Sequence, residues 1–122
     1  MREILFRGKN ITTGEWEVGN LVYLFKNVPY IHKSYGDAEI YREVDPETIG
    51  QYVATNFEEY QLFEGDFVKF PSDKKIGKVI WGAVEFWIVY DDAQYNVTAD
   101  EIQCYSLLGN KWDNPELWKG QE

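Results

Sequence analysis

Residues 44–70 read VDPETIGQYVATNFEEYQLFEGDFVKF, and this stretch decides how the chain is organised. Asp45 suits the N-cap of a helix, and Pro46 suits the first helical position because its fixed φ matches that of a helix. Gly50 follows only four residues after Pro46. The helical piece is therefore predicted to last one turn at most, before the chain becomes extended.

The same stretch ends in a second turn, formed by Gly65 and Asp66, which precedes an alternating strand. Glycine adopts the positive φ of a tight turn without steric cost, and the aspartate carboxylate can accept a backbone N–H across it. Turn formation also accounts for the neighbouring Glu64. We interpret residues 45–65 as a turn-rich seam that joins two sets of strands.

The remainder of the chain consists of short alternating segments. Aromatic residues make up 17% of it, and they favour pleated, half-buried strands. Residues 1–44 predict N-terminal strands, and residues 66–122 predict a β-meander followed by a short helix at Asn114 and Pro115. The predicted fold is a single domain, 1–122, that is mainly β (α+β with a minor helix): a small antiparallel β-barrel or a strongly curved sheet with a short C-terminal helix.

Four local predictions depend on the hydrophobic pattern. Residues 21–25 are expected to be a comparatively buried run. Residues 56–60 are expected to form a polar loop whose aromatic side chains fold back on the body. Residues 84–90 are apolar on nearly both faces and are expected to form the central strand. Residues 102–108 are expected to form the last strand, on which Cys104 fills part of the core.

Length and composition limit the class of protein. The chain has 122 residues, a net charge of −9, 27% charged residues and 44% hydrophobic residues, which is typical of an acidic, ordered protein. Its first residues include no apolar segment of signal-peptide length, and its longest apolar run falls short of the roughly 20 residues that span a bilayer. We expect a cytoplasmic protein. Cys104 is the only cysteine, so an internal disulfide is impossible.

Residues with catalytic potential are few and scattered. His32 is the only histidine, and a general base needs a partner within reach that no motif supplies. A reactive Cys104 would need surroundings that favour its thiolate. The acidic pairs lie in predicted loops and turns, and the patterns of phosphate loops, serine hydrolases and zinc proteases are absent. We therefore predict no catalytic residue, metal site or cofactor, and no enzymatic activity.

Five tryptophans are more than one small core readily buries. Trp16, Trp81, Trp112 and Trp118 are predicted to lie at an interface, because aromatic residues are enriched in protein–protein contacts. This pattern favours a homo-oligomer or a module that docks onto another protein. The alternative is a small β-barrel that stacks the bases of a single-stranded nucleic acid. The net charge of −9 repels phosphate and argues against that alternative.

Four segments together resemble the YopX-like proteins, a family of small proteins encoded by bacteriophages and prophages. They follow the family's order and span the chain: residues 2–7 (REILFR), 44–52 (VDPETIGQY), 63–68 (FEGDFV) and 108–117 (LGNKWDNPEL). Residues 53–60, VATNFEEY, depart from the family's usual Gly-Leu and Asp-Lys-Asn-Gly turn. The resemblance implies a mainly β fold and a phage or prophage context. Together with the expected cytoplasmic location, it leads us to expect a small accessory protein in the cytoplasm of the host bacterium. It implies no activity, because the family is largely uncharacterised.

Overall fold

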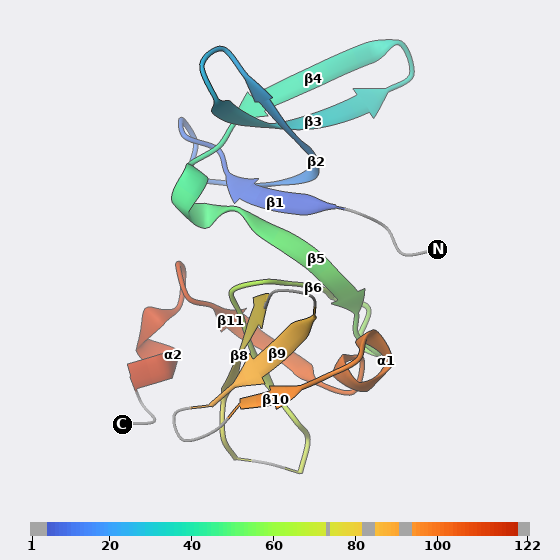
Figure 1. Ribbon diagram of the computed structural model, residues 1–122, viewed down its shortest axis with the longest axis vertical. Helices are drawn as coiled ribbons and strands as arrows, with labels where there is room; N and C mark the ends of the chain where they lie inside the picture. The colour runs from blue at the N-terminus through green and yellow to red at the C-terminus, as the bar shows by residue number, and fades with distance from the viewer. Residues whose placement is uncertain (1–4, 73, 82–84, 91–93, 120–122) are drawn as a thin grey trace. The chain divides into compact units, whose positions relative to one another are not determined.

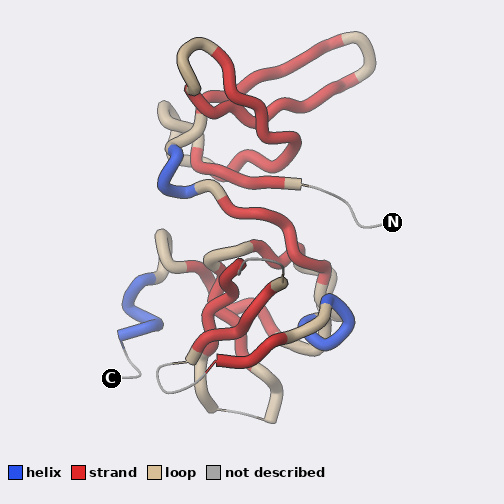
Figure 2. Tube along the Cα trace, in the orientation of Figure 1, coloured by secondary structure: helices blue, strands red, loops and turns tan. Residues whose placement is uncertain are grey.

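The computed structural model describes residues 5–72, 74–81, 85–90 and 94–119, and strands dominate its regular structure (Figure 1, Figure 2). The predicted mainly β fold with few, short helices is confirmed. The strands of the described ranges form two sheets, each with two open edges. The barrel alternative is therefore wrong, because neither sheet closes on itself.

The chain separates into two compact units, residues 1–52 and 53–122. The boundary falls within the segment 45–65 that the sequence predicts as a seam. β5 carries the chain from the first unit into the second.

The first sheet runs in the order β4-β3-β2-β1-β5-β6. The pairs among β1, β2, β3 and β4 are antiparallel, as is the pair of β1 with β5. A single 3₁₀ turn, η1, connects β4 to β5. The elements are β1 (Phe6–Lys9), β2 (Trp16–Leu24), β3 (Val28–Tyr35), β4 (Ala38–Glu43), η1 (Pro46–Thr48), β5 (Gly50–Thr55) and β6 (Gln61–Phe63).

Strand β2 pairs with two different strands along its length. Its first half pairs with β1 and its second half with β3, and the exchange occurs after Gly19. A Cβ at Gly19 would lie 2.6 Å from the carbonyl oxygen of His32, so only glycine allows this close approach of two strands. Ile31 and Val44, both in this unit, are completely buried.

The second sheet runs in the order β10-β9-β8-β7-β11. The core of the second unit includes Leu62, from β6, and Val68, Val79 and Ile88, from the second sheet, and all four have a relative exposure of 0%. Besides β6 and the end of β5, the elements of the second unit are β7 (Asp66–Lys69), β8 (Gly77–Trp81), β9 (Phe86–Val89), β10 (Gln94–Asn96), α1 (Ala99–Ile102), β11 (Ser106–Asn110) and α2 (Pro115–Lys119).

The strand predicted over 84–90 is internal but not central. β9 lies between β8 and β10, while β8 occupies the middle of the sheet. The predicted inward face is correct where it is described, since Phe86, Ile88 and Tyr90 are buried. Residue 84 lies outside the described residues. Hydrophobic pattern identifies a buried strand, but strand order depends on the pairing of β7 with β11, which are distant in sequence.

The last strand begins later than predicted, and the expected burial of Cys104 is wrong. Ile102 ends the one-turn helix α1, and Cys104 follows it as an exposed residue before β11. A capping box causes the helix: the Thr98 hydroxyl accepts the N–H of Glu101, and the Glu101 carboxylate accepts the N–H of Thr98. The helical turn changes the direction of the side chains, so Ile102 is buried and Cys104 is not.

Two predictions of aromatic burial are also wrong. Phe25 is 79% exposed, because residues 25–27 all adopt positive φ in a tight turn that directs its side chain away from the core. Phe57 is 72% exposed, and Tyr60 is exposed as well. The loop that carries them is held by polar bonds to Asn56, so its aromatic rings are not needed to fix it.

Candidate interaction surface

Strand β4 forms one edge of the first sheet (Figure 1). An edge strand presents backbone N–H and C=O groups that can pair with a further strand. Ile40 is partly buried, whereas Tyr41 is 46% exposed and Arg42 is exposed. Glu39 and Glu43 also lie on this strand. The edge therefore combines an apolar centre with charges of both signs.

The side chains of β4 alternate between two faces of the sheet. Ile40 and Arg42 share one face, and Glu39 and Tyr41 share the other, as their partners on β3 require. The two faces therefore carry different sets of side chains.

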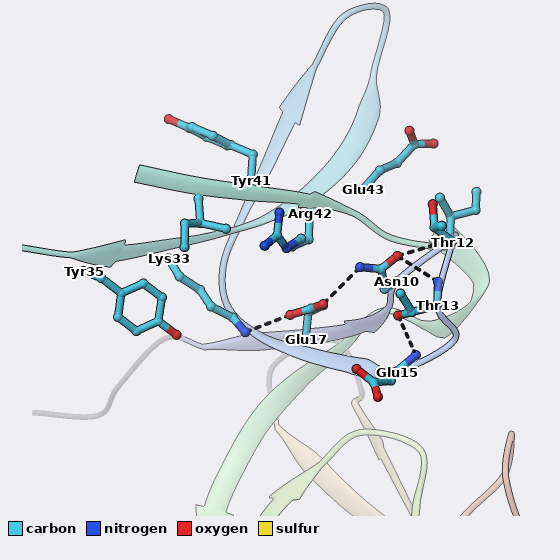
Figure 3. Close-up of a pocket in the computed structure, with 12 residues that line it drawn as sticks. Asn10, Thr12, Thr13, Glu15, Glu17, Lys33, Tyr35, Tyr41, Arg42 and Glu43 are labelled. Carbon is cyan, nitrogen blue, oxygen red and sulfur yellow. Dashed lines mark hydrogen bonds and ion pairs between the residues drawn. The ribbon is translucent and has the colours of Figure 1, made fainter. Parts of the chain in front are cut away.

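A cleft of about 610 Å³ opens on the face of Ile40 and Arg42 (Figure 3). Its volume lies within the roughly 300–1,000 Å³ of typical ligand sites. β2, β3, β4 and the loop after β1 contribute to it. The lining residues are Asn10, Ile11, Thr12, Thr13, Glu15, Glu17, Lys33, Tyr35, Ile40, Tyr41, Arg42 and Glu43.

Asn10 builds the loop that closes one end of the cleft. Its side-chain oxygen accepts the N–H groups of Thr12 (2.8 Å) and Thr13 (3.2 Å), and its backbone carbonyl accepts the N–H of Gly14 (2.8 Å). Its side-chain NH₂ donates to Glu17 at 3.1 Å. One asparagine thus folds the loop and anchors it to β2.

An ion pair forms the polar floor of the cleft. Lys33 Nζ donates to Glu17 Oε1 at 2.8 Å, and both side chains are largely buried. The hydrogen bond from Lys33 is the main cause that lowers the pKa of Glu17, and the positive charge of Arg42 adds a smaller contribution. Figure 3 shows Lys33 and Arg42 directed toward Glu17 from two adjacent strands.

The opposite face of β3 and β4 carries a second polar cluster. The ring of His32 stacks on Tyr41 with 4.8 Å between centroids, and its Nε2 lies 3.4 Å from Oε2 of Glu39. The Ser34 hydroxyl donates to the same carboxylate oxygen. This bond from Ser34 lowers the pKa of Glu39, with a smaller contribution from His32. The cluster holds side chains of β4 in place against β3.

The second unit has an aromatic hollow of about 420 Å³. Phe70 and Tyr105 meet edge to face at 5.3 Å, and Tyr90 and Tyr95 do so at 5.8 Å. Ser72 completes the lining. Such ring geometry stabilises the packing of this surface.

The residues predicted to form the first turn lie together. Asp45 is the N-cap of η1, and its carboxylate accepts the N–H of Glu47 at 3.0 Å. Pro46 is the first residue of η1, and Gly50 is buried at the start of β5. Thr48, which the sequence interpretation missed, is buried and donates its hydroxyl to the carbonyl of Asp45 at 2.7 Å.

The second predicted turn is tightly enclosed. Gly65 has φ +96°, donates its N–H to the carbonyl of Val79 (2.8 Å) and accepts the N–H of Lys111 (3.0 Å). Asp66 is only 1% exposed, and its carboxylate accepts the N–H of Phe63 at 2.7 Å. Neither residue lines the cleft of the first unit or the aromatic hollow of the second, and their hydrogen bonds stabilise the turn.

The C-terminal pair begins the short helix α2. Pro115 is its first residue, and the carbonyl of Asn114 accepts the N–H of Leu117 at 3.1 Å. The side-chain oxygen of Asn114 turns back to accept the N–H of Asn110 at 3.2 Å. Asn114 thus joins the end of β11 to the start of the helix.

Three of the four selected tryptophans, Trp16, Trp112 and Trp118, lie beside cations of their own unit. Arg7 lies 4.4 Å and Lys9 lies 5.4 Å from the ring centroid of Trp16. Lys111 lies 4.8 Å from that of Trp112. These contacts use intramolecular cation–π attraction and cover part of each ring.

Trp118 and Trp81 contact aromatic rings. Trp118 stacks on Phe67 at 5.8 Å, and Lys78 lies 5.0 Å from its centroid. Trp81 tilts against Phe86 at 4.2 Å and stays 37% exposed. Intramolecular partners therefore account for much of the tryptophan content, and an interface at these positions stays a prediction.

His32 belongs to the first unit and Cys104 to the second. Across residues 5–72, 74–81, 85–90 and 94–119, no group of three or more His, Cys, Asp or Glu side chains is arranged to hold a metal ion. Within the same residues, no helix is long and apolar enough to cross a membrane.

Sequence interpretation also missed Asn56, which organises the loop after β5. Asn56 is buried, and its side-chain oxygen accepts the N–H groups of Glu58 (3.0 Å) and Tyr60 (2.9 Å). Its NH₂ donates to the carbonyl of Tyr105 at 3.0 Å. An asparagine after a strand is a local turn signal, but its burial depends on contact with a segment 49 positions away.

No protein-family model matches the chain, and a search of curated proteins finds no match either. The resemblance to the YopX-like family therefore stays a prediction.

Proposed function

We propose that this protein is a small protein-interaction module whose contact surface is β4 together with the adjoining cleft. Taking the sequence resemblance into account, we further propose that it is an accessory protein of a phage or prophage and acts in the bacterial cytoplasm. The observation that carries the proposal is the open edge of β4 beside a cleft of about 610 Å³.

An edge strand and an adjacent cleft suit an extended partner segment. Backbone hydrogen bonds to the edge provide affinity, and alternate side chains of the added strand point toward each face. On the cleft side, these side chains would meet Tyr35 and Arg42. On the other side they would meet Tyr41, an exposed aromatic residue.

The charges of the cleft favour selection among partners. Lys33 and Arg42 bring positive charge, while Glu15 and Glu17 bring negative charge. A mixed pattern attracts a complementary partner and penalises one with opposed like charges. The protein is acidic overall, with a net charge of −9, so self-repulsion limits non-specific association.

A second candidate function, binding of single-stranded nucleic acid, is favoured by the aromatic hollow of the second unit. Tyr95 is 57% exposed at that hollow and is available to stack a base. Net charge opposes it. Anisotropy of labelled single strands at low salt tests this candidate: binding that weakens with added salt supports it, and a flat titration removes it.

Site-specific photo-crosslinking tests the proposed surface. A photo-reactive phenylalanine analogue replaces Tyr41 in the full chain, and the matched control carries it at Phe57, which is also exposed but lies in the other unit. We expect covalent adducts with a polypeptide at position 41 and few at position 57. Equal adduct yields at the two positions, or none at position 41, would contradict the proposal.

A further inference from the structure

We propose that the strand which pairs with β4 is β4 of a second copy of this chain, antiparallel to it, with a two-fold axis at Ile40. The inference rests on the proposed function and deepens it by naming the partner. It follows from the spacing of charges along β4, whose sequence is AEIYRE over residues 38–43.

Symmetry restricts how two copies of one strand can pair. Residues directly opposite each other in a sheet share a face, and a two-fold axis perpendicular to the sheet preserves the face of every residue. The axis must therefore lie midway between one residue and the same residue of the second copy, which face each other across the interface. For this strand the possible centres with at least three paired positions are residues 39, 40, 41 and 42.

Charge distinguishes these centres. An axis at Glu39 opposes two glutamates, and an axis at Arg42 opposes two arginines. An axis at Tyr41 places Glu39 of each copy opposite Glu43 of the other, which makes two like-charge pairs. An axis at Ile40 opposes no like charges within the strand, because Ala38 then faces Arg42 and Glu39 faces Tyr41. Like charges directly opposite destabilise a sheet, so we select the Ile40 register, in which the only opposed like charges, Asp37 and Glu43, meet where the strand ends and the turn begins.

The selected register also fits the sizes of the side chains. On the cleft face, the two Ile40 side chains meet at the axis, and the partner's Arg42 lies beside the small side chain of Ala38. Beyond Ala38 on β3 is Tyr35, its cross-strand neighbour. The long arginine can therefore extend across Ala38 toward the exposed ring of Tyr35, an arrangement that suits cation–π attraction.

On the opposite face, each Glu39 lies beside the partner's Tyr41. Glu39 already accepts a bond from Ser34, and Tyr41 is stacked on His32. These groups are thus held by β3 before assembly, which reduces the side-chain freedom lost on pairing. The joined edges would form one continuous sheet across both copies.

Disulfide trapping tests the register. Ile40→Cys is introduced with Cys104→Ser, because Cys104 is exposed and would form unrelated crosslinks. Opposed residues of an antiparallel pair have Cα atoms about 4.5–5.5 Å apart, which a disulfide spans. The matched control is Ala38→Cys in the same background. In the proposed register the two copies of residue 38 are offset by about 14 Å along the strand, too far for a disulfide.

Mild oxidation of the full chain is followed by a non-reducing gel, with circular dichroism melts to verify that both variants fold. We expect the Ile40→Cys variant to become predominantly dimeric and the Ala38→Cys variant to stay monomeric. Equal crosslinking of both variants, or no crosslinking at position 40, would overturn the inference. Photo-adducts from position 41 to a different protein, without crosslinking at position 40, would retain the proposed function and reject the second copy as its partner.

Discussion

The indole of Trp112 packs directly against the Cα of Gly65, so a Cβ at Gly65 would collide with the aromatic ring. The same glycine has φ +96°, which L-residues with a side chain rarely adopt. Two independent constraints therefore act on one position. A double-mutant cycle with Trp112 measures the cost of the positive φ and the cost of the steric contact separately.

Gly65→Ala is expected to destabilise the second unit strongly. Positive φ costs roughly 1–2 kcal/mol for an alanine, and overpacking against the ring costs about 1–3 kcal/mol more. Trp112→Ala should remove the overpacking part, so Gly65→Ala costs less in that background. Denaturant unfolding of the four proteins measures both terms, and an equal cost in the two backgrounds would refute the steric role of Trp112. Gly65→Val is expected to be worse than Gly65→Ala.

Asn56→Ala is expected to destabilise the second unit by about 2 kcal/mol or more, because it removes three hydrogen bonds and leaves buried backbone groups with fewer partners. Asn96→Ala is the matched control, since Asn96 lies in the same unit and bonds to Glu85 at an exposed site. Its effect should stay within about 0.5 kcal/mol. Chemical unfolding followed by tryptophan fluorescence compares them, and similar losses would contradict the role given to Asn56.

These residues show which features of the fold can be predicted from the sequence. Asp45-Pro46, Gly65-Asp66 and Asn114-Pro115 were accessible because turns and caps depend on neighbours within a few positions. The Thr98–Glu101 capping box was equally local and was overlooked. Its S/T-x-x-E spacing is a recognised helix signal.

The candidate surface could not be predicted from the sequence in the same way. Glu17 and Lys33 are 16 positions apart and meet only because β2 and β3 are brought together in the first sheet. The edge position of β4 likewise depends on the strand order, which hydrophobic periodicity does not specify. The high tryptophan content led to a predicted interface at the tryptophans, whereas the exposed aromatic residue on the edge strand β4 is Tyr41.

The ion pair in the cleft predicts a pH dependence. The folded state lowers the pKa of Glu17, chiefly through Lys33, so the carboxylate contributes stability above its unfolded pKa of about 4.3. That contribution is lost as pH falls through the lower pKa of the folded state. Glu17→Gln should therefore lose less stability than the unmodified protein between about pH 5 and pH 3.

Denaturant unfolding at several pH values checks this difference, with Glu15→Gln as the control for removal of one negative charge from the same cleft. An acid-dependent loss of stability in Glu17→Gln as steep as that of the unmodified protein would contradict the role of the ion pair.

Asp37 provides a variant that should strengthen self-association. In the Ile40-centred register, this turn residue falls opposite Glu43 just beyond the paired strands, at both ends of the interface. Asp37→Asn removes two like-charge contacts, so the dimer should persist at lower protein concentration, most clearly at low salt. Sedimentation equilibrium measures the change. Weaker or unchanged association would count against the register.

Hydrogen–deuterium exchange of the backbone of β4 tests the central claim most directly. At high protein concentration, amides of Ala38–Glu43 should exchange slowly, and they should exchange faster on dilution or in Ile40→Asp, which opposes two negative charges at the axis. Gln94–Asn96 of β10, the edge of the second sheet, serves as the internal control and should not respond. Exchange in β4 that is equally fast at every concentration and unaltered by Ile40→Asp would contradict the assignment of this edge as the self-association surface.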